Sequence, residues 1–147
     1  MRLAHPTSPN DQAWLQLRAK LWPHVHNSEH VADLELWLQA GHFACVAFVD
    51  QTPVGLAEAS CRTDYVNGTS TSPIAFLEGL YVVPDYRRRG VASSLVAEVR
   101  RWAHSRGFTE LASDAVLDNT VSHAVHRALG FVETERVVYF NSPVFVA

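Results

Sequence analysis

The sequence predicts a mixed α/β fold in which helices flank a mixed sheet, and two observations carry that prediction. First, apolar segments of strand length alternate with amphipathic segments of helix length along the whole chain of 147 residues. Second, an apolar run over 74–83, broken only by Glu78 and Gly79, is followed by a helix and then by another strand. A strand–helix–strand crossover of this kind places its two strands in parallel.

The first part of the chain is expected to hold a strand, two helices and a hairpin, over residues 2–5, 8–22, 27–40, 43–49 and 54–60. Ser8 is the expected cap of the first helix, with Pro9 at the first helical position. Gly41 ends the second helix. Residues 50–53 read as the hairpin turn.

The second part is expected to hold a long polar loop, the central strand, and then alternating helices and strands, over residues 62–73, 74–83, 90–105, 111–116, 119–129 and 132–140. Residues 144–146 are a candidate last strand. The helix over 90–105 has one apolar face, formed by Val91, Leu95, Val96, Val99 and Trp102. Gly130 ends the last helix.

Length and composition indicate one globular domain over residues 1–147. Hydrophobic residues make up 48% of the chain and charged residues 18%. No apolar run approaches the roughly 18 residues of a membrane span, and no signal peptide is seen, so we expect a cytoplasmic protein without a membrane partner. Cys45 and Cys61 lie in apolar segments and are expected to be reduced thiols. The net charge of −3 argues against nucleic acid as a partner.

The turn after the central strand has the pattern of a phosphate-binding loop. Three consecutive arginines, Arg87, Arg88 and Arg89, precede a step of small residues, Gly90-Val91-Ala92, that opens a helix. Free N–H groups at a helix N terminus, with guanidinium groups beside them, bind phosphate oxygens. A triple arginine alone is also typical of a solvated turn or a nucleic-acid patch. Its place between a long strand and a helix favours phosphate binding.

The element order, the loop Arg87-x-x-Gly90-x-Ala92 and the late pattern Asn119…His126-x-x-x-Gly130-Phe131 together resemble the GNAT acetyltransferase superfamily over nearly the whole chain. The resemblance implies a central sheet whose parallel strands splay apart, and acetyl-CoA as co-substrate. Further words are similar to the bacterial aminoglycoside 6'-N-acetyltransferases, which inactivate antibiotics: Leu21-Trp22-Pro23, Asp64-Tyr65-Val66-Asn67-Gly68, Ser72-Pro73, Phe76-Leu77-Glu78-Gly79, Ala112-Ser113-Asp114 and Glu133-Thr134-Glu135-Arg136.

This resemblance implies which residues bind acetyl-CoA. The N–H groups from Arg89 to Ala92 would take the pyrophosphate, and main-chain groups near Tyr81 would pair with the pantetheine arm. Asn119 either contacts the cofactor or is an ordinary helix cap. The residues implied for the cofactor are Leu80, Tyr81, Val82, Arg87, Arg88, Arg89, Gly90, Val91, Ala92 and Asn119.

The acceptor, an aminoglycoside in this reading, is a polycation, so its site needs acids. Glu78 and Asp114 lie in adjacent strands, where acids are unusual unless they meet a cation. The alternative is that one or both pair with an arginine such as Arg62 or Arg136. The residues expected to bind the acceptor are Trp22, His24, Asp33, Tyr65, Glu78, Asp114 and Glu135, with Glu35 as an alternative to Asp33 and core packing as an alternative role for Trp22.

The expected chemistry is attack of a neutral amine on the thioester carbonyl, which requires a group to accept the proton. Glu78 is the first candidate base and Asp114 the second. His126 stands where many GNAT enzymes have a tyrosine that protonates the CoA thiolate. His126 is therefore either the general acid or a packing residue.

Three histidines, His24, His26 and His30, have a spacing that zinc sites use. No cysteine or other ligand joins them, so we expect no metal.

Quaternary structure and function each leave alternatives. The apolar segments 137–140 and 144–146 suggest an edge strand that pairs with a partner, and related enzymes are often dimers, so a homodimer is expected.

Two other functions compete with aminoglycoside acetylation. One is a GNAT acetyltransferase for another amine, such as a polyamine or a protein N-terminus. The other is a non-catalytic acyl-CoA-binding module, which the presence of both acids disfavours.

Overall fold

A computed structural model describes residues 1–145 of the chain. The elements in order are β1 (Arg2–Ala4), α1 (Gln12–Leu21), α2 (Asn27–Gln39), β2 (Phe43–Val49), β3 (Thr52–Arg62), β4 (Ile74–Val82), the short 3-10 turn η1 (Pro84–Tyr86), α3 (Val91–Ser105), β5 (Leu111–Ser113) and α4 (Thr120–Ala128). They fall into two compact units, Met1–Asp114 and Ala115–Ala147. No helix of the described residues is long and apolar enough to cross a membrane.

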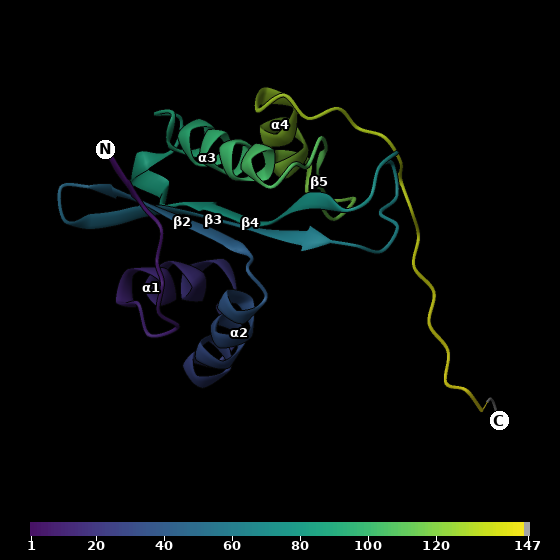
Figure 1. The fold of residues 1–147 in the computed structure, drawn as a ribbon, viewed down its shortest axis with the longest axis horizontal. Coiled ribbons are helices and arrows are strands. Elements are labelled where there is room, and N and C mark those ends of the chain that lie inside the picture. The colour runs from purple at the N-terminus through teal and green to yellow at the C-terminus, as the bar shows by residue number, and fades with distance from the viewer. Residues whose placement is uncertain (146–147) are drawn as a thin grey trace. The chain divides into compact units, whose positions relative to one another are not determined.

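The first unit is built on a five-stranded sheet with the order β1-β2-β3-β4-β5. All neighbouring pairs are antiparallel except β4 and β5, which are parallel. Helices α1 and α2 cover one face of the sheet and α3 covers the other (Figure 1). The predicted mixed sheet between helices, with a parallel crossover through α3, is therefore confirmed.

The two parallel strands pair over only three positions, and the last of these is Leu77 with Ser113. The Ser113 hydroxyl donates to the Leu77 carbonyl oxygen at 3.3 Å, and β5 ends there. Strand β4 continues to Val82, so its edge from Glu78 onward is not paired with β5. The resemblance places the splay of the two strands at this point, where their pairing ends.

A β-bulge lies next to this point. In the pairing of β3 with β4, Glu58 is opposite Gly79 but Ala59 is opposite Leu77, so Glu78 is the extra residue. Bulges bend a strand and re-aim side chains, and they are common beside active sites. The break that Glu78 and Gly79 make in the apolar run thus coincides with a structural irregularity.

The core has one layer on each face of the sheet. Under α1 and α2 the largest fully buried side chains include Trp14, Leu17, Leu34 and Leu56. On the other face, α3 buries Val91, Leu95, Val96, Val99 and Ala103. Trp102, expected on this face, is only half-buried and stacks on Phe43 with ring centroids 5.4 Å apart.

The start of α1 differs from the expectation. Asp11, not Ser8, is the N-cap, and its side chain accepts the Trp14 N–H at 3.0 Å. Ser8 lies in the preceding turn, where its carbonyl accepts the Asp11 N–H at 3.2 Å. Asp and Ser are about equally good N-cap residues. The turn places Asp11, and not Ser8, next to the first free N–H groups of the helix.

In the second unit, α4 begins after Asn119, whose side chain accepts the Ser122 N–H at 3.1 Å. It ends at Ala128, and Gly130 just beyond it has φ +93°. The predicted strand over 132–140 is wrong, because no described residue after Ser113 is in a strand. Val144 and Phe145 form none either, and Val146 lies outside the described residues. Strand-like side chains make a strand only where a neighbouring edge supplies hydrogen bonds.

Candidate active site

The turn between β4 and α3 has the backbone of an anion cradle. Arg88 has φ +61° and Gly90 has φ +83°, both in the left-handed region. Gly90 is the N-cap of α3, and no side chain caps this helix within the described residues. The first N–H groups of a helix have no partner inside it, so here they face the loop and its arginines. Left-handed non-glycine residues such as Arg88 cluster at binding sites.

The three arginines of this turn are exposed, and none pairs with a carboxylate among the described residues. Arg87 donates from Nε to the carbonyl oxygen of Val82 at 2.8 Å, which fixes it at the end of β4. The Arg89 guanidinium lies over the Tyr86 ring, 5.4 Å from its centroid. Positive charge without a counter-ion beside free N–H groups fits a diphosphate.

The Glu78 carboxylate is held by two residues of β3. Arg62 donates from Nη2 to Oε1 at 2.6 Å, and the Ser60 hydroxyl donates to Oε2 at 2.8 Å. The Arg62 guanidinium also lies 3.5 Å from the centre of the Phe76 ring. Pairing with Arg62 was one of the two expected alternatives, and it is the one observed. Any cation that reaches this carboxylate from outside the chain would share it with Arg62.

The second acid, Asp114, follows Ser113 directly, as Glu78 follows Leu77. The two acids thus stand one residue beyond the last paired positions, where the parallel strands part. Asp114 is exposed and makes no ion pair among the residues described. Arg136, the other expected partner, pairs with Glu133 instead. Asp114 is therefore open to a cation from outside the chain.

Trp22 lies beside Glu78. It is the C-cap of α1, and its ring packs against Gly79, where a Cβ atom would come within 2.8 Å of the Trp22 Cη2 atom. The half-buried ring leaves part of its surface to a ligand. Packing and ligand contact, the two expected roles, are thus compatible.

The other expected acceptor residues are exposed. Asp33 has 59% of its side chain exposed and lies 3.8 Å from the Arg18 Nη1 atom. His24 is exposed in the turn between α1 and α2, and Glu35 is exposed on α2. Glu135 is exposed in the second unit.

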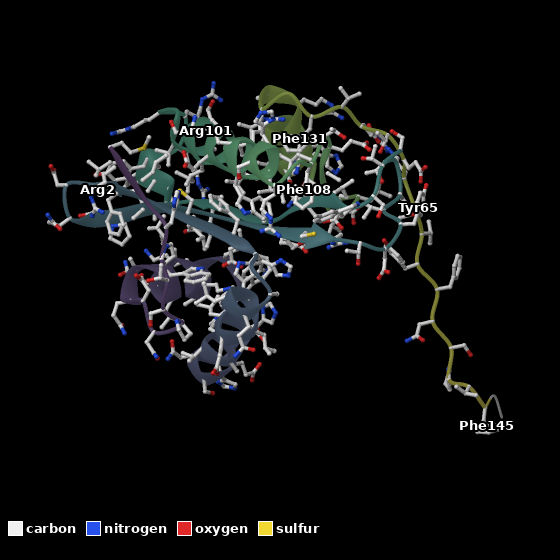
Figure 2. All side chains as sticks on the ribbon, in the orientation of Figure 1. Arg2, Tyr65, Arg101, Phe108, Phe131 and Phe145 are labelled. Atoms are coloured by element: carbon white, nitrogen blue, oxygen red, sulfur yellow. The ribbon has the colours of Figure 1, made fainter. Side chains whose placement is uncertain are left out.

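Tyr65 is on the loop that joins β3 to β4, with 73% of its surface exposed (Figure 2). This loop is anchored at its far end by Glu110, whose carboxylate accepts the N–H groups of Ser70 and Thr71 at 3.0 and 2.7 Å. The Thr71 hydroxyl also donates to this carboxylate. That hydrogen bond is the main reason that the pKa of Glu110 is lowered, and the backbone N–H groups add to the effect. Glu110 thus holds the end of the loop that leads into β4, while Tyr65, near the other end, is exposed and can contact a ligand.

In the second unit, His126 lies on α4 with its Nδ1 atom 2.7 Å from the Ser122 carbonyl oxygen. Its ring meets Phe131 edge-on, with centroids 5.3 Å apart. Both contacts come from residues close to His126 in the sequence. Together they fix the orientation of the imidazole ring. Asn119 acts as the helix cap, one of its two expected roles.

Comparison with known proteins decides the family. The model of the Acetyltransferase (GNAT) family matches residues 12–131. This chain is a member of the GNAT family. It is 53% identical to an aminoglycoside N(6')-acetyltransferase type 1 of Acinetobacter genomosp. 13, over 89% of this chain and 90% of the relative.

Solved structures agree with this membership. The GNAT chain superposes with a TM-score of 0.92 on the apo aminoglycoside 6'-N-acetyltransferase of Acinetobacter haemolyticus, at 43% identity over 99% of this chain and all of the other. It superposes with a TM-score of 0.91 on AAC(6')-Iy, at 44% identity over 97% of each chain. That enzyme was solved with the bisubstrate analogue CoA-S-monomethyl-acetylneamine.

The three histidines of the GNAT chain whose spacing resembles that of a zinc site do not form a cluster. His24 and His26 are exposed, whereas His30 is buried, and no group of metal-binding side chains occurs among the described residues. Neither ring nitrogen of His30 makes a well-formed hydrogen bond. Burial, and then the nearby Arg18, lower the pKa of His30. Burial also lowers the pKa of His42; the Glu78 carboxylate opposes this shift, and Arg106 adds to it.

These lowered pKa values predict a loss of stability in acid. A histidine that is neutral when folded takes up protons on unfolding below its ordinary pKa of 6.5, so the unfolded state binds more protons there. The free energy of unfolding is therefore expected to fall from about pH 7.5 to about pH 5.5. In His30→Leu the fall should be smaller, as measured by thermal melts across this range. The exposed His104→Leu is the control, and an equal fall in all three proteins would contradict the prediction.

Several residues of the site were not predicted from the sequence. Ser60 supports Glu78, Glu110 anchors the Tyr65 loop, and Arg18 and Glu58 form a buried pair behind Trp22. Two of them left a trace in the sequence. Arg18 interrupts the apolar face of α1, and Glu58 interrupts the apolar run of β3. A charged side chain on a buried face requires a partner.

Proposed function

We propose that the chain transfers an acetyl group from acetyl-CoA to the 6'-amino group of aminoglycoside antibiotics and thereby confers resistance. The observation that carries this proposal is the superposition on AAC(6')-Iy, whose bound analogue joins CoA to an acetylated aminoglycoside fragment. Relatives about half identical over nine tenths of their length bear the name of the same activity. The cradle, the open strand edge and the acids described above fit both substrates.

Acetyl-CoA would lie along β4 and over the start of α3. The N–H groups from Arg89 to Ala92 would take the pyrophosphate, with the charges of Arg87 and Arg88 beside them. The edge of β4 at Leu80, Tyr81 and Val82 would pair with the amides of the pantetheine arm, as an added strand does. Asn119 is proposed to contact the cofactor while it caps α4.

The acceptor would be held by its ammonium groups. Asp114 and Glu78 supply negative charge where the strands part, and Trp22 supplies a flat wall for a sugar ring. Asp33, His24, Tyr65 and Glu135 are proposed to complete the site. Glu35 is the alternative to Asp33.

The reaction needs a neutral amine. The amine nitrogen loses a proton to Glu78, directly or through water, with Asp114 as the second candidate, and attacks the thioester carbon. A carbon–nitrogen bond forms, and a strand N–H near Leu80 or Tyr81 stabilises the oxyanion. The carbon–sulfur bond then breaks, and the CoA thiolate takes a proton, for which His126 is the candidate donor. The nitrogen gives up its second proton to water, so that one proton is released overall. The products are the amide and CoA thiol.

The role of His126 can be measured. His126→Ala is expected to lower kcat only about tenfold, less than the usual effect of losing a general acid, because a thiolate leaves readily without a proton. The KM of the acceptor should change less, because the donor acts on the leaving thiolate and not on acceptor binding. His123→Ala, on the same helix, is the matched control. Steady-state kinetics with tobramycin separates the two constants. An unchanged kcat in His126→Ala would leave His126 a packing role.

Two properties of the whole molecule are also proposed. The chain is proposed to work in the cytoplasm as a single domain over residues 1–147, since the family match crosses the boundary between the two units. A homodimer is proposed because the C-terminal segment exposes large apolar side chains, among them Tyr139, Phe140 and Phe145 at 87%, 92% and 91%. Exposed apolar area of this kind marks an interaction surface. Sedimentation of the full chain tests the dimer.

The proposed function is tested in a susceptible bacterium. Expression of the chain should raise the inhibitory concentration of tobramycin and leave that of an aminoglycoside without a free 6'-amine unchanged. Resistance to both would mean another acetylated position. Unchanged susceptibility to every aminoglycoside would overturn the proposal. Acetylation of a polyamine by the purified chain would then favour another small amine, and CoA binding without turnover would favour a binding module.

A further inference from the structure

Behind Trp22 lies a buried polar cluster that the proposed mechanism does not use. Glu58 is fully buried, and its Oε2 atom accepts hydrogen bonds from Trp14 Nε1 at 2.9 Å and from Arg18 Nε at 3.0 Å. Oε1 of Glu58 has no hydrogen-bond partner, whereas Nη1 of Arg18, which also makes no hydrogen bond, lies 3.8 Å from the Asp33 carboxylate. The residues Trp14, Arg18 and Glu58, which we name the Glu58 cluster, join α1 to the middle of β3.

Stability alone does not account for the Glu58 cluster. The free energy needed to remove two charges from water is as large as the free energy gained from their attraction. Apolar residues of similar volume therefore often stabilise a fold more than a buried ion pair does. Burial raises the pKa of Glu58, Arg18 and Trp14 oppose that shift, and the Glu78 carboxylate adds to it. A pair that costs this much and leaves a buried carboxylate oxygen without a hydrogen bond points to a role in geometry.

Arg18 connects the cluster to the acceptor side of the site. Trp22 follows Arg18 by one helical turn, and its N–H bonds to the Arg18 carbonyl oxygen at 2.9 Å. Residues four apart lie on the same face of a helix. The Arg18 guanidinium accordingly lies over the Trp22 ring, 4.9 Å from its centroid. With Nε bound to Glu58, the guanidinium plane cannot turn freely.

The Trp22 ring also meets the strand that carries the candidate base. The ring packs against Gly79, the residue next to Glu78, so closely that no side chain fits there. Trp22 is thus confined by two contacts, the guanidinium of Arg18 and the backbone of β4. Loss of the first would leave the ring free to tilt.

We propose that the Glu58–Arg18 pair is a positioning device for the acceptor site: it fixes the Arg18 guanidinium against Trp22, so that the indole stands ready beside Glu78. This inference rests on the proposed function, in which Trp22 forms a wall of the acceptor site. Glu58 and Arg18 touch neither substrate. They set the affinity for the acceptor through Trp22, while the acetyl-CoA cradle at the other end of β4 is untouched.

Two conservative variants separate positioning from packing. Glu58→Gln keeps the shape and an acceptor for Trp14 but removes the charge that holds Arg18. Arg18→Lys keeps the charge but loses the planar group that stacks on Trp22. Both are expected to raise the KM of the acceptor about tenfold, with kcat and the KM of acetyl-CoA within about twofold of wild type. Trp14→Phe, which removes a hydrogen bond from the cluster without touching the Arg18–Trp22 contact, is the control and should leave the acceptor KM unchanged.

A double-mutant cycle with Trp22 gives the decisive reading. In a Trp22→Ala background, Glu58→Gln should change the acceptor KM no further, because the ring through which it acts is gone. Thermal melts of every variant show whether it folds. A full tenfold effect of Glu58→Gln in the Trp22→Ala background, or an unchanged acceptor KM in both conservative variants, would overturn the inference. Absence of tobramycin acetylation by the wild-type chain would instead overturn the proposed function, and this inference with it.

Discussion

Replacing Glu78 with glutamine is expected to lower kcat for aminoglycoside acetylation by about 10²- to 10⁴-fold, the range found for removal of a general base. The change is nearly isosteric. The amide oxygen of the glutamine can accept from Arg62 in place of the oxygen held at 2.6 Å, and its NH2 group can donate to the Ser60 hydroxyl, which lies 2.8 Å from the other carboxylate oxygen, so the local structure is kept. What is lost is the capacity to take the proton that the acceptor's ammonium group must lose before its nitrogen can attack. Steady-state kinetics at saturating acetyl-CoA measures the effect.

Two further variants complete this experiment. Asp114→Asn should raise the acceptor KM more than it lowers kcat, because Asp114 is exposed, carries no counter-ion among the described residues and attracts the cation. Glu98→Gln removes a carboxylate of α3 that pairs with Arg101 and His5, far along the chain from the parting strands, and serves as the control. If Asp114→Asn lost more kcat than Glu78→Gln, the base would be Asp114. A kcat within about threefold of wild type in both would exclude a carboxylate base.

The elements that depend on local pattern were predictable from the sequence. Helix α3 was expected because its apolar side chains recur at helical spacing, and it buries four of the five residues expected on that face, Val91, Leu95, Val96 and Val99. Helix α2 begins at Asn27, as expected, and Gly41 beyond its end has φ +74°. The cradle at Gly90 was predictable for the same reason, since a small-residue helix start after a strand is a local feature.

Features that depend on partners far along the chain were not predictable. Glu78 and Arg62 are both visible in the sequence, but only the register of β3 against β4, with its bulge, brings the two together. The same holds for Arg18 and Glu58, which lie 40 residues apart and meet only when α1 packs on the sheet. The segment 132–140 shows the converse error. Its side chains favour a strand, but nothing in their pattern says whether an edge is present to pair with.

Replacing Gly90 with valine is expected to raise the Kd of acetyl-CoA about 100-fold, which corresponds to the loss of one or two hydrogen bonds to a charged group. Gly90 has φ +83°, a conformation that a β-branched residue adopts only at a cost. Relief of that strain turns the backbone of the cradle and moves its N–H groups away from the pyrophosphate. Calorimetric titration of the variant with CoA measures the affinity directly.

The same helix offers a matched control for this strain. Gly107, just beyond the C terminus of α3, has φ +81°, and like Gly90 it has no atom within 4 Å of an added Cβ. Gly107→Val should therefore lose stability to a similar degree, about 1–2 kcal/mol of unfolding free energy, while its affinity for CoA is unchanged. Equal affinities in the two variants would mean that the turn at Gly90 does not hold the pyrophosphate. Because a thermal melt of each variant reports the strain separately, a loss of CoA binding confined to Gly90→Val can be assigned to the cradle and not to a weakened fold.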